Sequence, residues 1–106
     1  MSSNVDILED IKIDEKTRKT IKEPIRYKVV MLNDDSTPME WVIDILKLIF
    51  SHSNETAKTL TLQIHNEGSG IAGIYTYEIA EQKTVEATNI SRQQGFPLQV
   101  RIEPNE

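Results

Sequence analysis

The feature that most restricts the fold is a helix start placed directly behind a strand pattern. Residues 26–32 are rich in valine and other strand-favouring residues, and they end in the polar turn Asn33-Asp34-Asp35-Ser36. Thr37-Pro38-Met39-Glu40 then supplies a capping threonine, a proline at the first helical position and a glutamate three residues after the cap. The apolar residues that follow have helical spacing; they are Met39, Val42, Ile43, Leu46, Ile49 and Phe50. The sequence therefore predicts a strand, a tight polar turn and an amphipathic helix in immediate succession.

The rest of the chain predicts two more helices and two more strands. They are expected as a helix at about 55–66, a strand at 70–75, a helix at about 77–94 and a strand at 98–103. Gly68 and Gly95 stand where helices commonly stop, and Thr61 lies one turn before His65 on the second helix. The order β-α-α-β-α-β predicts an α+β fold, with a small antiparallel sheet packed by helices.

The length of 106 residues fits one small domain. We expect residues 25–106 to form the folded core and residues 1–24 to form a flexible N-terminal extension. Charges of both signs crowd that extension, and it ends at Pro24, which disfavours helix at the preceding residue. A leader without a role is an equally open interpretation of these 24 residues.

Composition excludes several classes of partner. Acidic residues outnumber basic ones, 17 to 12, for a net charge of −5, which argues against nucleic acid because phosphate binding needs clustered Lys and Arg. The longest apolar run, Val29-Val30-Met31-Leu32, is too short to cross a bilayer, and acidic residues interrupt the N-terminus where a signal peptide needs apolar ones. With no cysteine, the chain is expected to be cytoplasmic.

Several catalytic and metal-binding motifs are absent from the sequence. There is no His-Glu-x-x-His pair, no phosphate-binding glycine loop and no Gly-x-Ser-x-Gly, and the acidic turn lacks the further ligands of a calcium-binding hand. A triad of an Asp-His pair with Ser36 or Ser69 has no supporting context. We therefore expect no catalytic activity, no metal and no cofactor.

Two places could bind a ligand. The turn Asn33-Asp34-Asp35 is explained by ordinary turn chemistry, yet two adjacent carboxylates repel each other and would be stabilised by a bound cation. His65, near the end of a helix, is typical of a capping or packing residue as well as of a functional one. The residues alone leave both alternatives open.

The same stretches closely resemble the signature of the ClpS family, the bacterial adaptor of the N-degron pathway. The resemblance is carried by Tyr27-Lys28-Val29-Val30, by the run from Leu32 to Ile43, by Ile64-His65-Asn66-Glu67-Gly68, by the run from Gly73 to Lys83 and by Pro97-Leu98. It covers roughly residues 25 to 103 in unbroken register, which is far more specific than a single motif.

The resemblance implies a function. ClpS proteins bind proteins whose first residue is Leu, Phe, Tyr or Trp and deliver them to the AAA+ unfoldase ClpA, or ClpC in some bacteria, for degradation by ClpP. By position, the ligand's α-amino group would be bound by Asn33, Asp34, Asp35 and His65. The hydrophobic side-chain pocket would be formed by Thr37, Pro38, Met39, Val42, Thr61, Ile64 and Leu98. Glu78 and Lys83 would dock on the N-domain of the unfoldase, and the N-terminal extension would enter the unfoldase during delivery.

Thr61 is the clearest departure from the family. Many ClpS proteins have a methionine there, which narrows the pocket, so a threonine predicts that this protein accepts N-terminal Ile or Val better than a relative with methionine does. Ser36, often tyrosine in relatives, is a lesser difference. The competing hypothesis is a protein-interaction domain that captures nothing, like the C-terminal domain of the ribosomal stalk protein, which has a similar fold.

Overall fold

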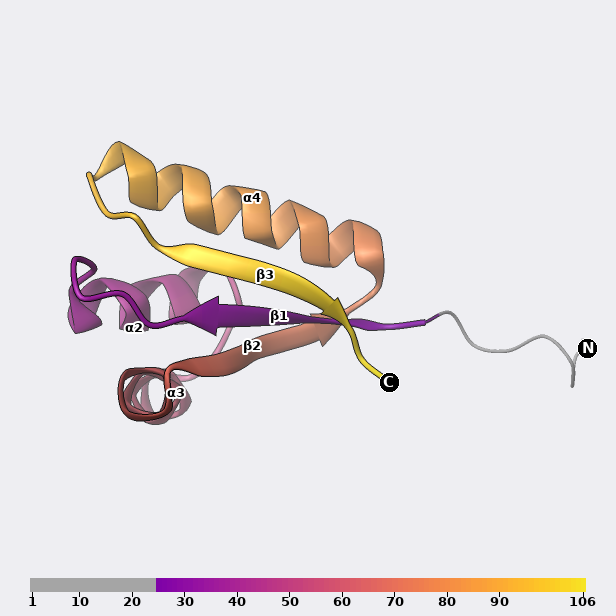
Figure 1. Ribbon diagram of the computed structural model, residues 1–106, viewed down its shortest axis with the longest axis horizontal. Helices are drawn as coiled ribbons and strands as arrows, with labels where there is room; N and C mark the ends of the chain where they lie inside the picture. The colour runs from indigo at the N-terminus through magenta and orange to yellow at the C-terminus, as the bar shows by residue number, and fades with distance from the viewer. Residues whose placement is uncertain (1–24) are drawn as a thin grey trace, which may run out of the picture.

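The computed structural model describes residues 25–106. The expected N-terminal extension, residues 1–24, lies outside the described residues. The described elements are β1 (Tyr27–Leu32), α2 (Met39–Leu48), α3 (Asn54–Glu67), β2 (Ser69–Tyr75), α4 (Tyr77–Gln93) and β3 (Gln99–Pro104) (Figure 1). The predicted order β-α-α-β-α-β and the α+β class are confirmed.

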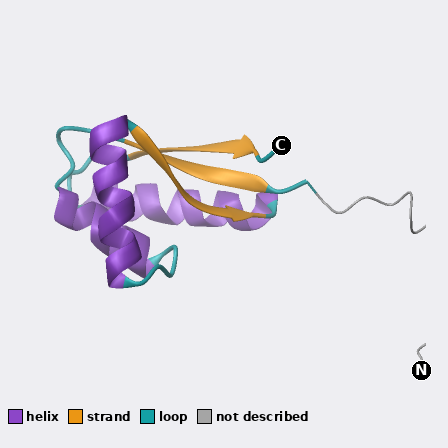
Figure 2. Cartoon of the chain, turned by 90° about the horizontal axis from the view of Figure 1, so that it is seen from below, coloured by secondary structure: helices purple, strands orange, loops and turns teal. Residues whose placement is uncertain are grey.

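Within residues 25–106 the three strands form one antiparallel sheet in the order β2-β1-β3. β1 is the central strand, and α4 runs alongside the sheet in contact with all three strands (Figure 1). Figure 2 shows the molecule from below, with the long helix running along the strands. Because β1 is central, the turn that follows it emerges from the middle of the sheet, where α2 and α3 can both reach it.

The hydrophobic core lies between the sheet and the helices. Val29 and Met31 of β1 are fully buried and belong to this core, and Val30 between them is buried as well, at 6% exposed. Ala80 and Ala87 of α4 are also fully buried, and their small side chains let the helix approach the sheet closely. Each large apolar side chain in this core stabilises the fold by ~1.5–3 kcal/mol. This packing holds the ends of α2 and α3 at the end of β1.

The start of α2 differs from the prediction. Helix α2 begins at Met39, and Pro38 occupies the N-cap position without a side-chain cap. The prediction that Thr37 caps this helix is wrong, because Thr37 stands one residue before the N-cap, and its hydroxyl donates to the Asp34 carboxylate at 2.6 Å. A hydrogen bond from a hydroxyl to a carboxylate is about twice as strong as a neutral one. The Thr37 side chain is therefore held by the acidic turn, and the helix begins without a side-chain cap.

Helix α3 follows the predicted rules. Ser53 caps it by accepting a hydrogen bond from the Thr56 amide at 3.1 Å. Gly68 ends it in the left-handed conformation, with φ of 94°, as the sequence predicts. This left-handed glycine turns the chain directly into β2 and places the last turns of α3 beside the end of β1.

Replacing Thr84 by valine is expected to stabilise the fold by about 1 kcal/mol. The Thr84 hydroxyl oxygen is buried on α4 and has no hydrogen-bond partner among the described residues. Valine keeps the branched shape and removes the desolvated hydroxyl. The midpoint of urea unfolding, followed by circular dichroism, measures the change. Thr88→Val is the matched control, because the Thr88 hydroxyl already donates to the Thr84 carbonyl at 2.9 Å; an equal gain in both variants would contradict the explanation.

Candidate functional site

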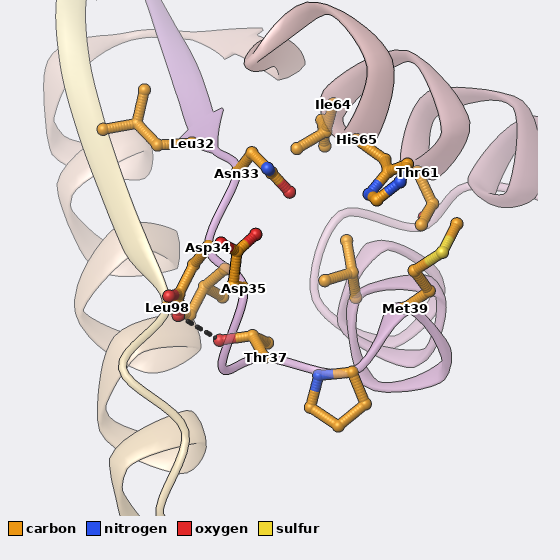
Figure 3. A pocket seen from close by; sticks show the side chains of 12 residues that line it. Leu32, Asn33, Asp34, Asp35, Thr37, Met39, Thr61, Ile64, His65 and Leu98 are labelled. Atoms are coloured by element: carbon orange, nitrogen blue, oxygen red, sulfur yellow. Dashed lines mark hydrogen bonds between the residues drawn. The ribbon is translucent and has the colours of Figure 1, made fainter.

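One cavity of about 250 Å³ opens at the end of β1, between the acidic turn, α2 and α3 (Figure 3). It is lined by Leu32, Asn33, Asp34, Asp35, Thr37, Pro38, Met39, Val42, Thr61, Ile64, His65 and Leu98. Sites for drug-sized ligands usually span ~300–1,000 Å³, so this cavity suits about one side chain. The structure thus brings the predicted amine-binding and pocket residues together around one cavity. Sequence reasoning missed Leu32, because a residue at a strand end gives no signal of its own.

The deep wall of the cavity is apolar. Val42 of α2, Ile64 of α3 and Leu98 before β3 are between 1% and 7% exposed. Met39 is 38% exposed and stands nearer the mouth. Three segments far apart in the sequence therefore form an apolar pocket that can remove one hydrophobic side chain from water.

The mouth of the cavity is polar. Asn33 and Asp35 reach it from the turn and His65 from α3, and all three residues are exposed (Figure 3). The Asn33 backbone N–H donates to the Gly68 backbone carbonyl at 2.9 Å, which ties the turn to the end of α3 and leaves the Asn33 side chain outside this bond. Among the described residues, the Asp35 carboxylate and the His65 ring have no hydrogen-bond partner. These side chains are therefore available to a ligand.

Asp34 has a different task from its neighbour. One carboxylate oxygen accepts the Ser36 amide at 3.2 Å, and the other accepts the Thr37 hydroxyl at 2.6 Å. Both oxygens thus serve the turn itself, as Asx turns commonly do. The two adjacent carboxylates therefore have different roles. Asp34 shapes the turn, and Asp35 faces the mouth of the cavity.

Thr61 forms part of the wall on α3 and is 2% exposed. Its hydroxyl donates to the Ala57 carbonyl at 2.7 Å, one turn earlier in the same helix. The hydroxyl already has its acceptor, so the contribution of Thr61 to the pocket is that of a short, branched apolar group.

The residues expected to dock on an unfoldase lie away from the cavity. Glu78 is exposed in the first turn of α4. The Lys83 ammonium donates to the Ile49 carbonyl at 2.8 Å and lies 5.4 Å from the centre of the Tyr75 ring. Burial raises the pKa of Tyr75 above its ordinary value. Lys83 therefore joins α4 to the end of α2, a contact that the sequence did not predict.

Two further observations concern residues 25–106. No group of three His, Asp or Glu side chains there is arranged to hold a metal ion. In the same residues no helix combines the length and the apolar character that a membrane crossing requires.

Comparison with known proteins gives a consistent result. The family model described as "ATP-dependent Clp protease adaptor protein ClpS" matches residues 22–101. The adapter protein ClpS of Cupriavidus metallidurans is 47% identical over 89 residues, which cover 84% of this chain and 82% of that protein. The ClpS of Gluconobacter oxydans is 45% identical over 82 residues, or 77% of this chain and 69% of that protein.

A solved structure shares the fold at a similar level of identity. It is that of Agrobacterium tumefaciens ClpS2 bound to L-phenylalaninamide, with a TM-score of 0.76 and 40% sequence identity. The match covers 78% of this chain and 100% of that one. The family match spans most of the chain and includes the turn, α2, α3 and the segment with Leu98 that build the cavity. This chain therefore belongs to the ClpS family of Clp protease adaptor proteins.

Proposed function

We propose that this protein captures polypeptides by a free, bulky N-terminal residue and hands them to the unfoldase ClpA or ClpC for degradation by ClpP. The first residues recognised are Leu, Phe, Tyr and Trp, joined by Ile and Val because Thr61 stands in the pocket wall. The observation that carries the proposal is the division of the cavity into a buried apolar wall and an exposed polar mouth. An N-terminal residue has the matching halves, a side chain and a charged amine.

The mouth suits a protonated α-amine. Such an amine carries one positive charge and three donors, and the mouth offers the Asn33 amide oxygen, the Asp35 carboxylate and a ring nitrogen of neutral His65. Hydrogen bonds to a charged group contribute ~1.5–3 kcal/mol each, and burial of one large apolar side chain adds ~1.5–3 kcal/mol. After the costs of association, affinity of about micromolar order results. Affinity of that order lets an adaptor release what it carries.

The ligand of the Agrobacterium relative has the same two halves. L-phenylalaninamide combines a free α-amine with a benzyl side chain and lacks a charged carboxylate. A carboxylate would be repelled by Asp34 and Asp35, whereas an amide resembles the next peptide bond of a protein. The compound is therefore a suitable minimal probe for this chain.

The lining supports binding without catalysis. Its two hydroxyls are already committed, that of Thr37 to the Asp34 carboxylate and that of Thr61 to the Ala57 carbonyl. Neither hydroxyl is paired with His65, so the lining does not present the nucleophile and base of a hydrolase. We assign the cavity a role in holding the ligand, performed in the bacterial cytoplasm. The exposed Glu78 at the start of α4 and the half-buried Lys83 further along the same helix meet the unfoldase.

A peptide that begins with Phe is expected to bind at micromolar concentration, at least about tenfold more tightly than the same peptide beginning with Gly. The difference arises because glycine leaves the apolar wall unfilled. Fluorescence anisotropy of peptides labelled at their C-terminus measures both affinities.

The same two first residues then test delivery. A reporter protein beginning with Phe should be degraded by ClpA–ClpP or ClpC–ClpP faster when this protein is added, and the Gly reporter should not. Equal affinities for the two peptides would refute capture. Tight binding without faster degradation by either protease would refute delivery alone.

A further inference from the structure

A polar contact outside the cavity lining joins α2 to α4. The indole N–H of Trp41, in the first turn of α2, donates to the Ser91 hydroxyl oxygen at 2.8 Å. Ser91 is fully buried near the end of α4 and lies 50 positions along the chain from Trp41. Met39 and Val42, which flank Trp41 on α2, line the cavity, whereas Trp41 and Ser91 do not. The bond therefore ties the helix that carries this cavity wall to α4.

The backbone of Ser91 also contacts the segment that carries Leu98, which forms a second wall of the cavity. Its carbonyl accepts the Phe96 amide at 2.9 Å, which closes the end of α4 and turns the chain back toward β3. The Phe96 ring packs on Trp41, with 5.4 Å between the ring centres. Two residues after Phe96 comes Leu98, 1% exposed and part of the cavity lining. Ser91 thus contacts Trp41, which lies on α2 with the first wall, and Phe96, which lies in the segment that carries Leu98.

We propose that Ser91 is a positioning residue of the pocket, which sets the separation between Leu98 and the α2 wall formed by Met39 and Val42. The inference rests on the proposed function, because it assigns these walls to the ligand's side chain. Ser91 touches no ligand and acts through Trp41 and Phe96. A gap of only ~0.5–1 Å forfeits a quarter to a half of the dispersion attraction between facing atoms. A small change in wall separation therefore alters which first residues fit.

The test compares Ser91→Ala with wild type. The substitution removes the hydroxyl, strands the Trp41 N–H and keeps the backbone carbonyl. It is expected to weaken L-phenylalaninamide binding by about fivefold and to change the affinity ratio of L-phenylalaninamide to L-leucinamide by about threefold. Trp41→Phe removes the donor instead of the acceptor. Both single variants break the same bond. The double variant is therefore expected to bind no more weakly than the single variant that has the lower affinity.

Thr88→Ala is the matched control. Thr88 lies one turn earlier on α4, and its hydroxyl bonds within that helix, to the Thr84 carbonyl. It should leave the affinity ratio unchanged. If Thr88→Ala changes the ratio as much as Ser91→Ala does, the effect belongs to α4 in general and the proposal is overturned.

A ligand-free measurement separates this proposal from the proposed function. In amide and indole NMR spectra, Ser91→Ala should shift the resonances of Trp41, Met39, Val42 and Leu98, whereas Thr88→Ala should not. If those resonances stay in place, or if they shift while the affinity ratio does not change, Ser91 is not a positioning residue. If wild type fails to bind L-phenylalaninamide, the proposed function falls, and the resonance shifts alone decide whether Ser91 sets the cavity walls.

Discussion

Acetylation of the N-terminal amine is expected to weaken the binding of a Phe-peptide about a hundredfold or more. Acetylation removes the positive charge and two of the three donors that Asn33, Asp35 and His65 would bind. The loss of two charge-assisted hydrogen bonds at ~1.5 kcal/mol or more each amounts to ~3 kcal/mol. The benzyl side chain is unchanged, so any loss belongs to the polar mouth. Titration of free and acetylated forms of one labelled peptide measures it, and equal affinities would sink the capture model.

Substitutions of the two aspartates are the matching test on the side of the protein. Asp35→Asn keeps an acceptor oxygen but removes the charge at the mouth, so affinity should fall about tenfold while the unfolding midpoint stays near that of wild type. Asp34→Asn should instead lower the unfolding midpoint, because both Asp34 oxygens hold the turn through Ser36 and Thr37. A larger loss of affinity with unchanged stability in Asp34→Asn would reverse the roles assigned here.

Local rules were enough to predict most of the fold. Gly68 predicts the end of α3 because glycine adopts the left-handed conformation at little cost, and the chain does turn there. Gly95 likewise predicts the end of α4, which stops at Gln93, and Gly95 has a positive φ of 84°. In each case the cause lies within a few residues of its effect, so a single sequence contains the information.

Competition and long-range contact could not be predicted in this way. Thr37 has the sequence signature of a helix cap, but it lies one residue before the N-cap, where its hydroxyl donates to the Asp34 carboxylate three residues away. The adjacent Asp34 and Asp35 have the same chemistry in sequence and acquire different tasks only through the geometry of the turn. The bond between Trp41 and Ser91 joins residues 50 positions apart, and it exists only once the sheet has placed α4 against α2.

Replacing Thr61 by methionine is expected to reduce binding of peptides that begin with Ile or Val by up to about a hundredfold, with much smaller effects on Leu and Phe. Thr61 lies in the wall one turn before His65, and its hydroxyl is committed to the Ala57 carbonyl. A methionine would extend from the same point toward the mouth. Ile and Val carry their branch at Cβ, close to the amine and therefore to that side chain, whereas Leu branches one carbon further in. Overpacking of this kind costs ~1–3 kcal/mol.

Titration of Leu-, Phe-, Ile- and Val-peptides against wild type and Thr61→Met tests this expectation. Thr61→Val is the matched control, because it keeps the branched shape and removes only a hydroxyl that bonds within the helix; its peptide preferences should follow those of wild type. Met39 and Ile64 line the same cavity and are the residues that would fill the space left by a short side chain at position 61. If they do so, wild type will reject Ile and Val as strongly as Thr61→Met does, and the width of the pocket is then set by those neighbours. Acceptance of Ile and Val by wild type and by Thr61→Val, together with rejection by Thr61→Met, would assign the choice of first residue to position 61.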